Sequence, residues 1–127
     1  MEKAPAELVD LARAWIAAGH ARDVDLMERL SATPEGGAVF CVASSPDSNL
    51  TLRGLLDHLK EYPPCEPVGS NPSGFVEGDV AWLFDNPKIL IPGEEGASIR
   101  ITVVLRRTID GWRVVHGHLS EGVAHLE

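Results

Sequence analysis

A chain of 127 residues, 44% of them hydrophobic, is long enough for one folded domain with a single core and too short for two. Its apolar runs are too short for a transmembrane span, and a formal net charge of −8 argues against nucleic acid or an anionic membrane as a partner, since both need a basic face. Two cysteines, with no apolar signal core at the N-terminus, indicate reduced thiols in a cytoplasmic protein.

The N-terminal part of the chain predicts two helices. From Ala6 to Ala18 apolar residues recur at helical spacing, with Pro5 suited to the first turn and Gly19 to the stop. A shorter helix is expected from Arg22 to Leu30, before a turn at residues 34–37.

A strand and a third helix follow. The run Ala38–Ala43 is short, apolar and β-branched, and turn residues bound it on both sides. Thr51 is suited to cap a helix that continues to about Tyr62 and ends at Pro63. Four residues of this helix form one apolar stripe: Leu52, Leu55, Leu56 and Leu59.

The second half of the chain predicts strands. Glu66–Gly74 is expected to be a loop or a weak edge strand, Phe75–Asn86 a strand, and Lys88–Ile91 a segment with some strand character. A long hairpin then runs from Ser98 to Ser120, because two β-branched runs flank the turn sequence Thr108–Gly111.

Helices first and antiparallel strands after them predict the α+β class, in one domain over residues 1–127. A strongly twisted sheet would wrap around the helices as a cone and leave a pocket between sheet and helices.

Several motifs resemble one family. Gly78-Asp79 before a strand with Trp82, the run RITVVLRR at 100–107 and the run GWRVVHGHLS at 111–120 are similar to the SnoaL-like group of the nuclear transport factor two and ketosteroid isomerase superfamily. The last strand also resembles the association domain of calcium/calmodulin-dependent kinase II.

The resemblance implies a cone-shaped α+β barrel, a homodimer that packs two convex sheet faces together, and a hydrophobic pocket between sheet and helices. Because that superfamily includes isomerases, cyclases, dehydratases, binding proteins and scaffolds, the fold alone does not assign an activity.

The sequence departs from the family pattern at two places. Ala38–Ala43, the apparent counterpart of the strand that carries the general-base Asp of ketosteroid isomerases, has no carboxylate, and Leu119 stands where the kinase domain has a pocket Arg.

Similarity to the association domain also implies which side chains face the pocket, since strand residues alternate. On the last strand, Val115, Gly117 and Leu119 would point inward, and His116 and His118 would lie on the convex side. On the preceding strand, the inward residues would be Arg100, Thr102, Val104 and Arg106, and the partner-facing ones Ile101, Val103 and Leu105. The pocket residues expected overall are Trp15, Leu56, Trp82, Phe84, Arg100, Thr102 and Leu119.

The pair His116 and His118 has the strand spacing that presents two imidazoles to one metal, with Glu121 nearby as in cupins. Structural histidines at an interface or pocket rim are the favoured alternative, because only nine residues follow His118 and the first sixty are largely helical. No metal is therefore predicted, and a cupin-like enzyme remains a third hypothesis.

Asp79 and Asp85 are the carboxylates closest to the presumed cavity strands, and either could act as a general base if buried; turn chemistry at Asp79 is the structural alternative. The first hypothesis is a pocket protein that binds an apolar polyketide-, steroid- or terpenoid-like ligand without a cofactor. As an enzyme it would catalyse an isomerisation, cyclisation or dehydration by proton transfer, with Asp79, His116 or His118 as the base and Arg100 and Trp82 orienting the ligand. A solvated cation at the strand end is the alternative for Arg100. The second is a non-catalytic dimeric ligand-binding or association module.

Overall fold

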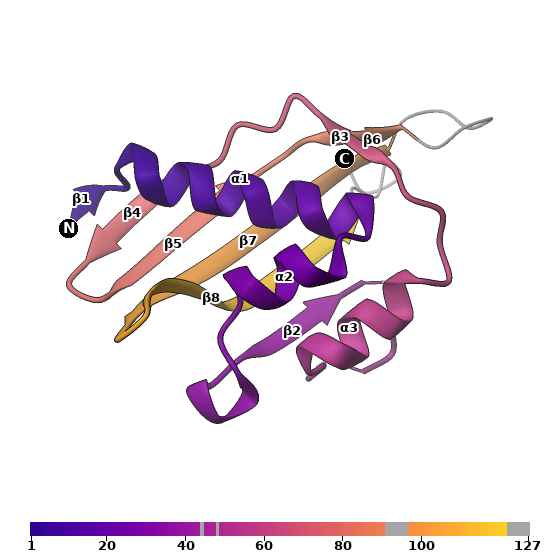
Figure 1. The fold of residues 1–127 in the computed structure, drawn as a ribbon. Coiled ribbons are helices and arrows are strands. Elements are labelled where there is room, and N and C mark those ends of the chain that lie inside the picture. The colour runs from indigo at the N-terminus through magenta and orange to yellow at the C-terminus, as the bar shows by residue number, and fades with distance from the viewer. Residues whose placement is uncertain (44, 48, 91–96, 122–127) are drawn as a thin grey trace.

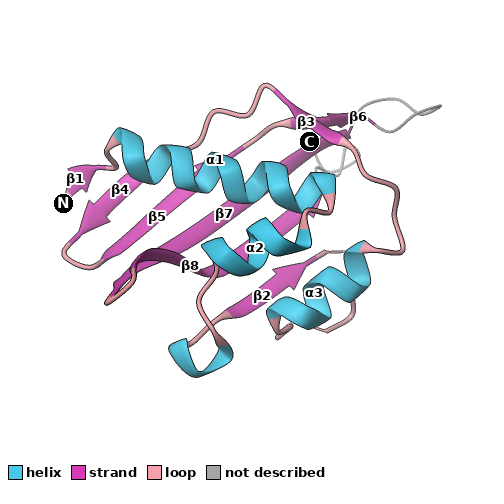
Figure 2. Cartoon of the chain, in the orientation of Figure 1, coloured by secondary structure: helices cyan, strands magenta, loops and turns pink. Residues whose placement is uncertain are grey.

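Helices lie on one side of a curved sheet in the computed structural model (Figure 1), which describes residues 1–43, 45–47, 49–90 and 97–121. The helices α1, α2 and α3 cover the concave face, and the opposite side of the sheet, here the convex face, carries no helix among these residues (Figure 2). This arrangement confirms the predicted α+β cone.

The longest helix, α1 (Ala6–Ala21), begins after Pro5 and turns its apolar stripe to the sheet. It runs past Gly19, where it was expected to end, because a glycine inside a helix costs only about 1 kcal/mol and the Met27 side chain packs over it. The helix ends at Ala21, and Arg22 follows as its C-cap, with a φ of 61° in the left-handed region.

Side-chain caps define the shorter helices. The Asp23 carboxylate accepts from Leu26 N at 3.2 Å at the start of α2 (Val24–Leu30), and Thr51 Oγ1 accepts from Gly54 N at 3.0 Å at the start of α3 (Leu52–Leu59). A 3₁₀ turn at Pro34–Gly36 leads into strand β2 (Val39–Val42). Helix α3 stops before the predicted Tyr62, because the two prolines that follow disfavour helical backbone.

The middle of the chain forms short strands. They are β3 (Glu66–Val68), β4 (Ser73–Glu77), β5 (Val80–Asp85) and β6 (Lys88–Leu90), and the two-residue β1 (Glu2–Lys3) pairs with β4. The single strand predicted over Phe75–Asn86 is therefore wrong. It is a hairpin that turns at Gly78-Asp79, where Gly78 has a φ of 59°. Ile91, the predicted end of the β6 segment, lies outside the described residues.

The predicted long hairpin is confirmed as β7 (Ala97–Thr108) and β8 (Gly111–Glu121). Gly111 supplies a φ of 104° at the turn, and Thr108 Oγ1 donates to Gly111 O at 2.7 Å. The sheet has the order β1-β4-β5-β7-β6-β3, with β8 paired to β7 and β2 to β8. Among the described strands every pairing is antiparallel except β2 with β8, which is parallel; the isolated bridge between Ser31 and Val114 is also parallel.

The alternation of β7 is opposite to the one expected. Four of its residues are at most 2% exposed and form the core beneath the helices: Ile99, Ile101, Val103 and Leu105. Ile101 pairs with Leu119 and Val103 with Gly117, and cross-strand partners project to the same face. Since Gly117 faces the helices, Val103 must face them too. A bulge between the pairs Val104–His116 and Leu105–Val114 leaves Val115 unpaired.

In the described chain, no helix is long and apolar enough to cross a membrane.

Candidate functional site

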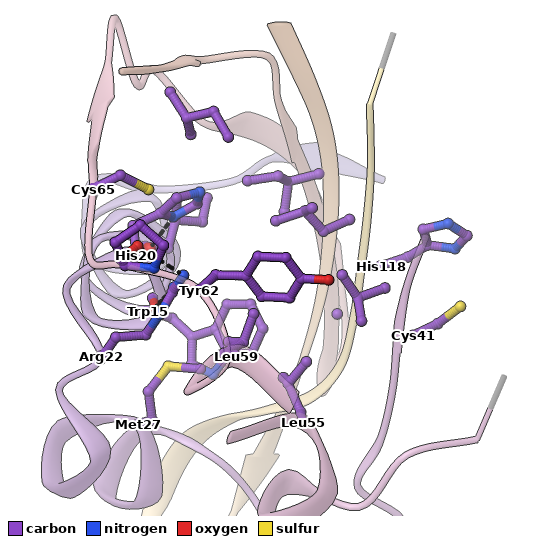
Figure 3. A pocket seen from close by; sticks show the side chains of 18 residues that line it. Trp15, His20, Arg22, Met27, Cys41, Leu55, Leu59, Tyr62, Cys65 and His118 are labelled. Carbon is purple, nitrogen blue, oxygen red and sulfur yellow. Dashed lines mark hydrogen bonds between the residues drawn. The ribbon is translucent and has the colours of Figure 1, made fainter. Parts of the chain in front are cut away.

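A cavity of about 160 Å³ lies between the helices and the inner face of the sheet. Its walls are mainly apolar and come from the three helices, the segment after α3, and strands β2, β6, β7 and β8 (Figure 3). The apolar lining includes Trp15, Ile16, Met27, Leu55, Leu59 and Ile101. Four side chains bring polar chemistry to it: His20, Arg22, Tyr62 and Cys65.

Trp15 is fixed on three sides. Its Nε1 donates to Ser31 Oγ at 2.9 Å in a buried hydrogen bond, and its ring stacks on Phe40 with 5.8 Å between centroids. On the sheet side, Gly117 makes room for it, because a Cβ at that position would lie 2.5 Å from Trp15 Cη2. The tryptophan is therefore a rigid wall of the cavity.

His20 is the most deeply buried polar side chain of the lining, at 7% exposure. Its Nδ1 lies 2.7 Å from Ile16 O, and since a carbonyl only accepts, Nδ1 carries the proton and Nε2 keeps its lone pair in the neutral ring. Burial lowers the pKa of His20, with a smaller contribution in the same direction from Arg22. The bond to Ile16 and the charge of Asp85 oppose this lowering. At neutral pH His20 is therefore an uncharged acceptor inside an apolar cavity.

Arg22 reaches the cavity from the end of α1. Its Nη1 donates to Gly19 O at 2.6 Å and its Nη2 to Pro63 O at 3.3 Å. Its Nε is buried and has no hydrogen-bond partner among the described residues. Burial lowers the pKa of the Arg22 guanidinium, and the nearby Cys65 opposes this effect. The group still carries a positive charge at neutral pH.

Cys65 and Tyr62 come from the segment that follows α3. Cys65 N donates to His20 O at 3.0 Å, which ties this segment to the end of α1, and burial raises the pKa of the Cys65 thiol. Tyr62 is 44% exposed, and its ring extends from the side of Arg22 toward the strands (Figure 3). The phenol therefore lies where the cavity meets solvent.

Only two of the seven predicted pocket residues, Trp15 and Leu119, line this cavity. Leu56 is 2% exposed and belongs to the core beside it. The other four lie on the convex face, so their predicted orientation is wrong: Trp82, Phe84, Arg100 and Thr102. The reason is the alternation of β5 and β7, which turns Ala81, Leu83 and Ile101 to the helices.

The two predicted carboxylates do not line the cavity either. Asp79 lies in the β4–β5 turn, 74% exposed at its side chain, and its Oδ1 is 3.5 Å from Arg107 Nε. Asp85 is buried and points inward, but its carboxylate accepts hydrogen bonds from Ser70 Oγ at 2.6 Å and from Asn71 N and Asn86 N at 2.9 Å each. It holds the loop before β4 and acts on His20 only through its charge.

The two histidines of β8 lie on the convex side, as expected. His116 Nδ1 donates to Val39 O at 2.7 Å. His118 is exposed and borders the cavity together with Cys41, but Figure 3 shows both side chains pointing away from it. Within the described residues no group of three or more potential metal ligands gathers here. The side chain of Glu121 lies outside them.

Sequence reasoning missed the polar residues of the cavity. His20 had a detectable signal, because it follows Ile16 by four positions on the apolar stripe of α1. Arg22 and Cys65 had none, since a left-handed residue after a helix and a cysteine in a Pro-rich loop acquire their place only through the tertiary fold.

Solved structures with the same fold are numerous. A protein described as a candidate dehydratase of the nuclear transport factor two-like family, from Streptomyces avermitilis, is 23% identical over 94% of this chain and 99% of its own, with a TM-score of 0.73. A candidate ketosteroid isomerase from Parabacteroides distasonis is 21% identical over 94% of this chain and 88% of its own, with a TM-score of 0.68.

A candidate calcium/calmodulin-dependent kinase II association domain from Thiobacillus denitrificans is 22% identical over 89% of this chain and 93% of its own, with a TM-score of 0.72. At these identities the likeness establishes the fold only. No curated protein matches the chain. The sequence model of the SnoaL-like domain matches residues 8–124, and the cone of helices and strands is the fold of its structural neighbours; the chain therefore belongs to the SnoaL-like domain family.

Proposed function

We propose that the cavity binds a small apolar molecule and that His20 acts on it as a general base, in an isomerisation, cyclisation or dehydration that uses no cofactor. The observation that carries this proposal is an uncharged imidazole, with Nδ1 engaged and Nε2 left as an acceptor, in the lining of an apolar cavity. Candidate isomerases and dehydratases among the structural neighbours support the reaction class by analogy only.

The volume of the cavity limits the size of the ligand. An apolar cavity of about 150 Å³ accepts one benzene ring, and this one measures about 160 Å³. A polyketide-like molecule with one ring of benzene size fits this volume, whereas a larger terpenoid or a four-ring steroid would need the opening at Tyr62 to widen.

In the proposed reaction, His20 Nε2 removes a proton from the carbon next to a ligand carbonyl. The imidazolium that forms keeps its Nδ1–H bond to Ile16 O, and the charge of Asp85 favours it. The electron pair moves to the carbonyl oxygen, to which the Tyr62 hydroxyl can donate a hydrogen bond. His20 then returns the proton to another carbon in an isomerisation, or to a departing hydroxyl in a dehydration.

Native mass spectrometry of untagged protein, before and after denaturation, identifies what co-purifies in the cavity. Proton exchange into deuterated water at the acidic carbon of that molecule, followed by NMR, then tests the base. We expect His20→Gln to reduce the exchange rate about 100-fold or more and His118→Gln, on the convex face, to leave it unchanged. Loss of exchange in His118→Gln alone would make β8 the catalytic element and the His20 assignment wrong.

A second candidate function is a non-catalytic dimeric module that binds a ligand or an association partner. An apolar patch on the convex side of β5 favours it, since Val80 is 42% and Phe84 48% exposed there. An empty dimer in the mass spectrum would support this candidate.

In either case the proposal places the protein in the cytoplasm, where Cys41 and Cys65, both free, would stay reduced.

A further inference from the structure

Arg22 is a charged side chain held in place beside an apolar cavity. Its left-handed backbone and its bonds to Gly19 O and Pro63 O fix the guanidinium between α1 and the segment after α3 (Figure 3). Both acceptors are neutral carbonyls. The hydrogen bonds therefore position the charge without neutralising it.

No other described group balances this charge. The ion pairs of the described residues do not include Arg22. His20 is uncharged at neutral pH, and the Cys65 thiol stays protonated because burial raises its pKa. Asp85, the one buried carboxylate among the described residues, already accepts three hydrogen bonds. The polar end of the cavity is therefore cationic, in a protein whose overall charge is −8.

The Nε of Arg22, which is buried without a hydrogen-bond partner, is the second observation that indicates an anionic ligand. A buried N–H without a partner is costly, and the edge formed by Nε and Nη2 is the one with which a guanidinium grips a carboxylate through two parallel bonds. Nη2 is held only by the longer bond, 3.3 Å to Pro63 O. A carboxylate that binds this edge would take the place of Pro63 O as the acceptor of Nη2 and supply the missing partner of Nε.

We propose that the ligand of the cavity is a small apolar carboxylic acid, whose carboxylate accepts hydrogen bonds from Nε and Nη2 of Arg22 while its hydrocarbon part fills the space against Trp15. This inference rests on ligand binding in the cavity, as proposed above, and is independent of proton transfer by His20. The acid must be of single-ring size, because the apolar space is about 160 Å³.

Benzoate and benzamide test the inference, since they share size and shape and differ in charge. With calorimetry at neutral pH, we expect the wild-type protein to bind benzoate about tenfold or more tightly than benzamide, the usual gain from a charge-assisted hydrogen bond. Arg22→Gln should remove the difference by weakening benzoate and leaving benzamide unchanged, and Arg22→Lys should keep part of it.

Arg53→Gln is the matched control, because Arg53 is exposed on α3, where it pairs with Glu28 at 3.4 Å, and its loss changes the net charge by the same amount. Equal affinities for the two probes in the wild type, or no binding of benzoate, would overturn the carboxylate assignment even if Arg22→Gln fails to fold. If a neutral apolar molecule co-purifies in the same protein, the pocket proposal stands and only the anchor is wrong.

Discussion

His20 illustrates how one side chain acquires chemistry from its surroundings. It lies on the apolar stripe of α1, so the helix carries it into the core, and the carbonyl of Ile16 one turn earlier takes its Nδ1 proton. Burial then disfavours the charged form, which leaves an uncharged acceptor at neutral pH. A residue that helical periodicity alone would assign to packing thus becomes the candidate base.

The lowered pKa of His20 predicts a pH dependence of stability. Since folding lowers this pKa, the unfolded chain binds the proton more readily, and stability falls as the pH drops below the usual value of 6.5. The loss stops growing once the pH is below the folded pKa. Urea unfolding, measured at several pH values between about 7.5 and 5, gives the free energy of unfolding at each pH. We expect this free energy to fall less steeply with decreasing pH in His20→Gln than in the wild type.

The exposed His118, changed in the same way, is the control for that titration. A slope equal to the wild-type one in His20→Gln would mean that carboxylates or other histidines cause the acid loss. The buried position of His20 would then have no measurable linkage to folding.

At the scale of elements, β8 decides the shape of the cavity. Gly117 lies in the middle of that strand and touches the Trp15 ring, while its neighbour Leu119 lines the cavity. A strand glycine is usually a weak point, but here the missing side chain lets α1 approach the sheet. The cavity therefore depends on a residue that contributes no side chain to it.

Gly117→Ala should destabilise the protein by about 1–3 kcal/mol, because its Cβ would lie 2.5 Å from Trp15 Cη2 and a rigid indole cannot yield without breaking its bond to Ser31. Denaturant unfolding measures the loss. Gly36→Ala is the matched control, since a Cβ there meets atoms no closer than 3.5 Å. Equal effects of the two substitutions would show that the indole contact is not tight.

The elements themselves were largely predictable. The apolar stripes of α1 and α3, the cap at Thr51 and the turn at Gly111 are local signals, and each gave the right element. Which face of each strand points to the helices was not predictable, because both faces of β5 carry large apolar residues. Hydrophobicity does not distinguish the inward Leu83 from the outward Phe84. The bulge at Val115 and the parallel pairing of β2 with β8 are tertiary facts without a local signature. The predicted site followed the wrong face and missed His20 and Arg22.

At the scale of the whole molecule, the convex face is the surface most suited to a second copy of the chain. Three successive outward positions of β5 are Val80, Trp82 and Phe84, and two of them are more than 40% exposed. Aromatic residues in the centre of an apolar patch are typical anchors of an interface. We therefore keep the homodimer as a proposal and change the residues expected to form it.

Phe84→Asp should shift the protein from dimer to monomer in sedimentation velocity with little change in its melting temperature, because it places a charge on an exposed patch. Ile109→Asp, at the fully exposed hairpin tip, is the matched control and should leave the dimer intact. Val103→Asp would test the interface only if Val103 faced the partner, as first expected. Because Val103 is 1% exposed in the core, this substitution would instead unfold the protein. A dimer that survives Phe84→Asp would refute the interface.

The parallel pairing of β2 with β8 joins the beginning of the chain to its later part: the His116 ring bonds to a carbonyl 77 positions earlier. A ribosome releases α1, α2 and β2 well before β7 and β8 are made, so the apolar side of the first helix has no sheet to cover it during that time. Loops of this length also slow folding. The apolar stripe of α1 therefore stays uncovered until the strands of the second half have been synthesised.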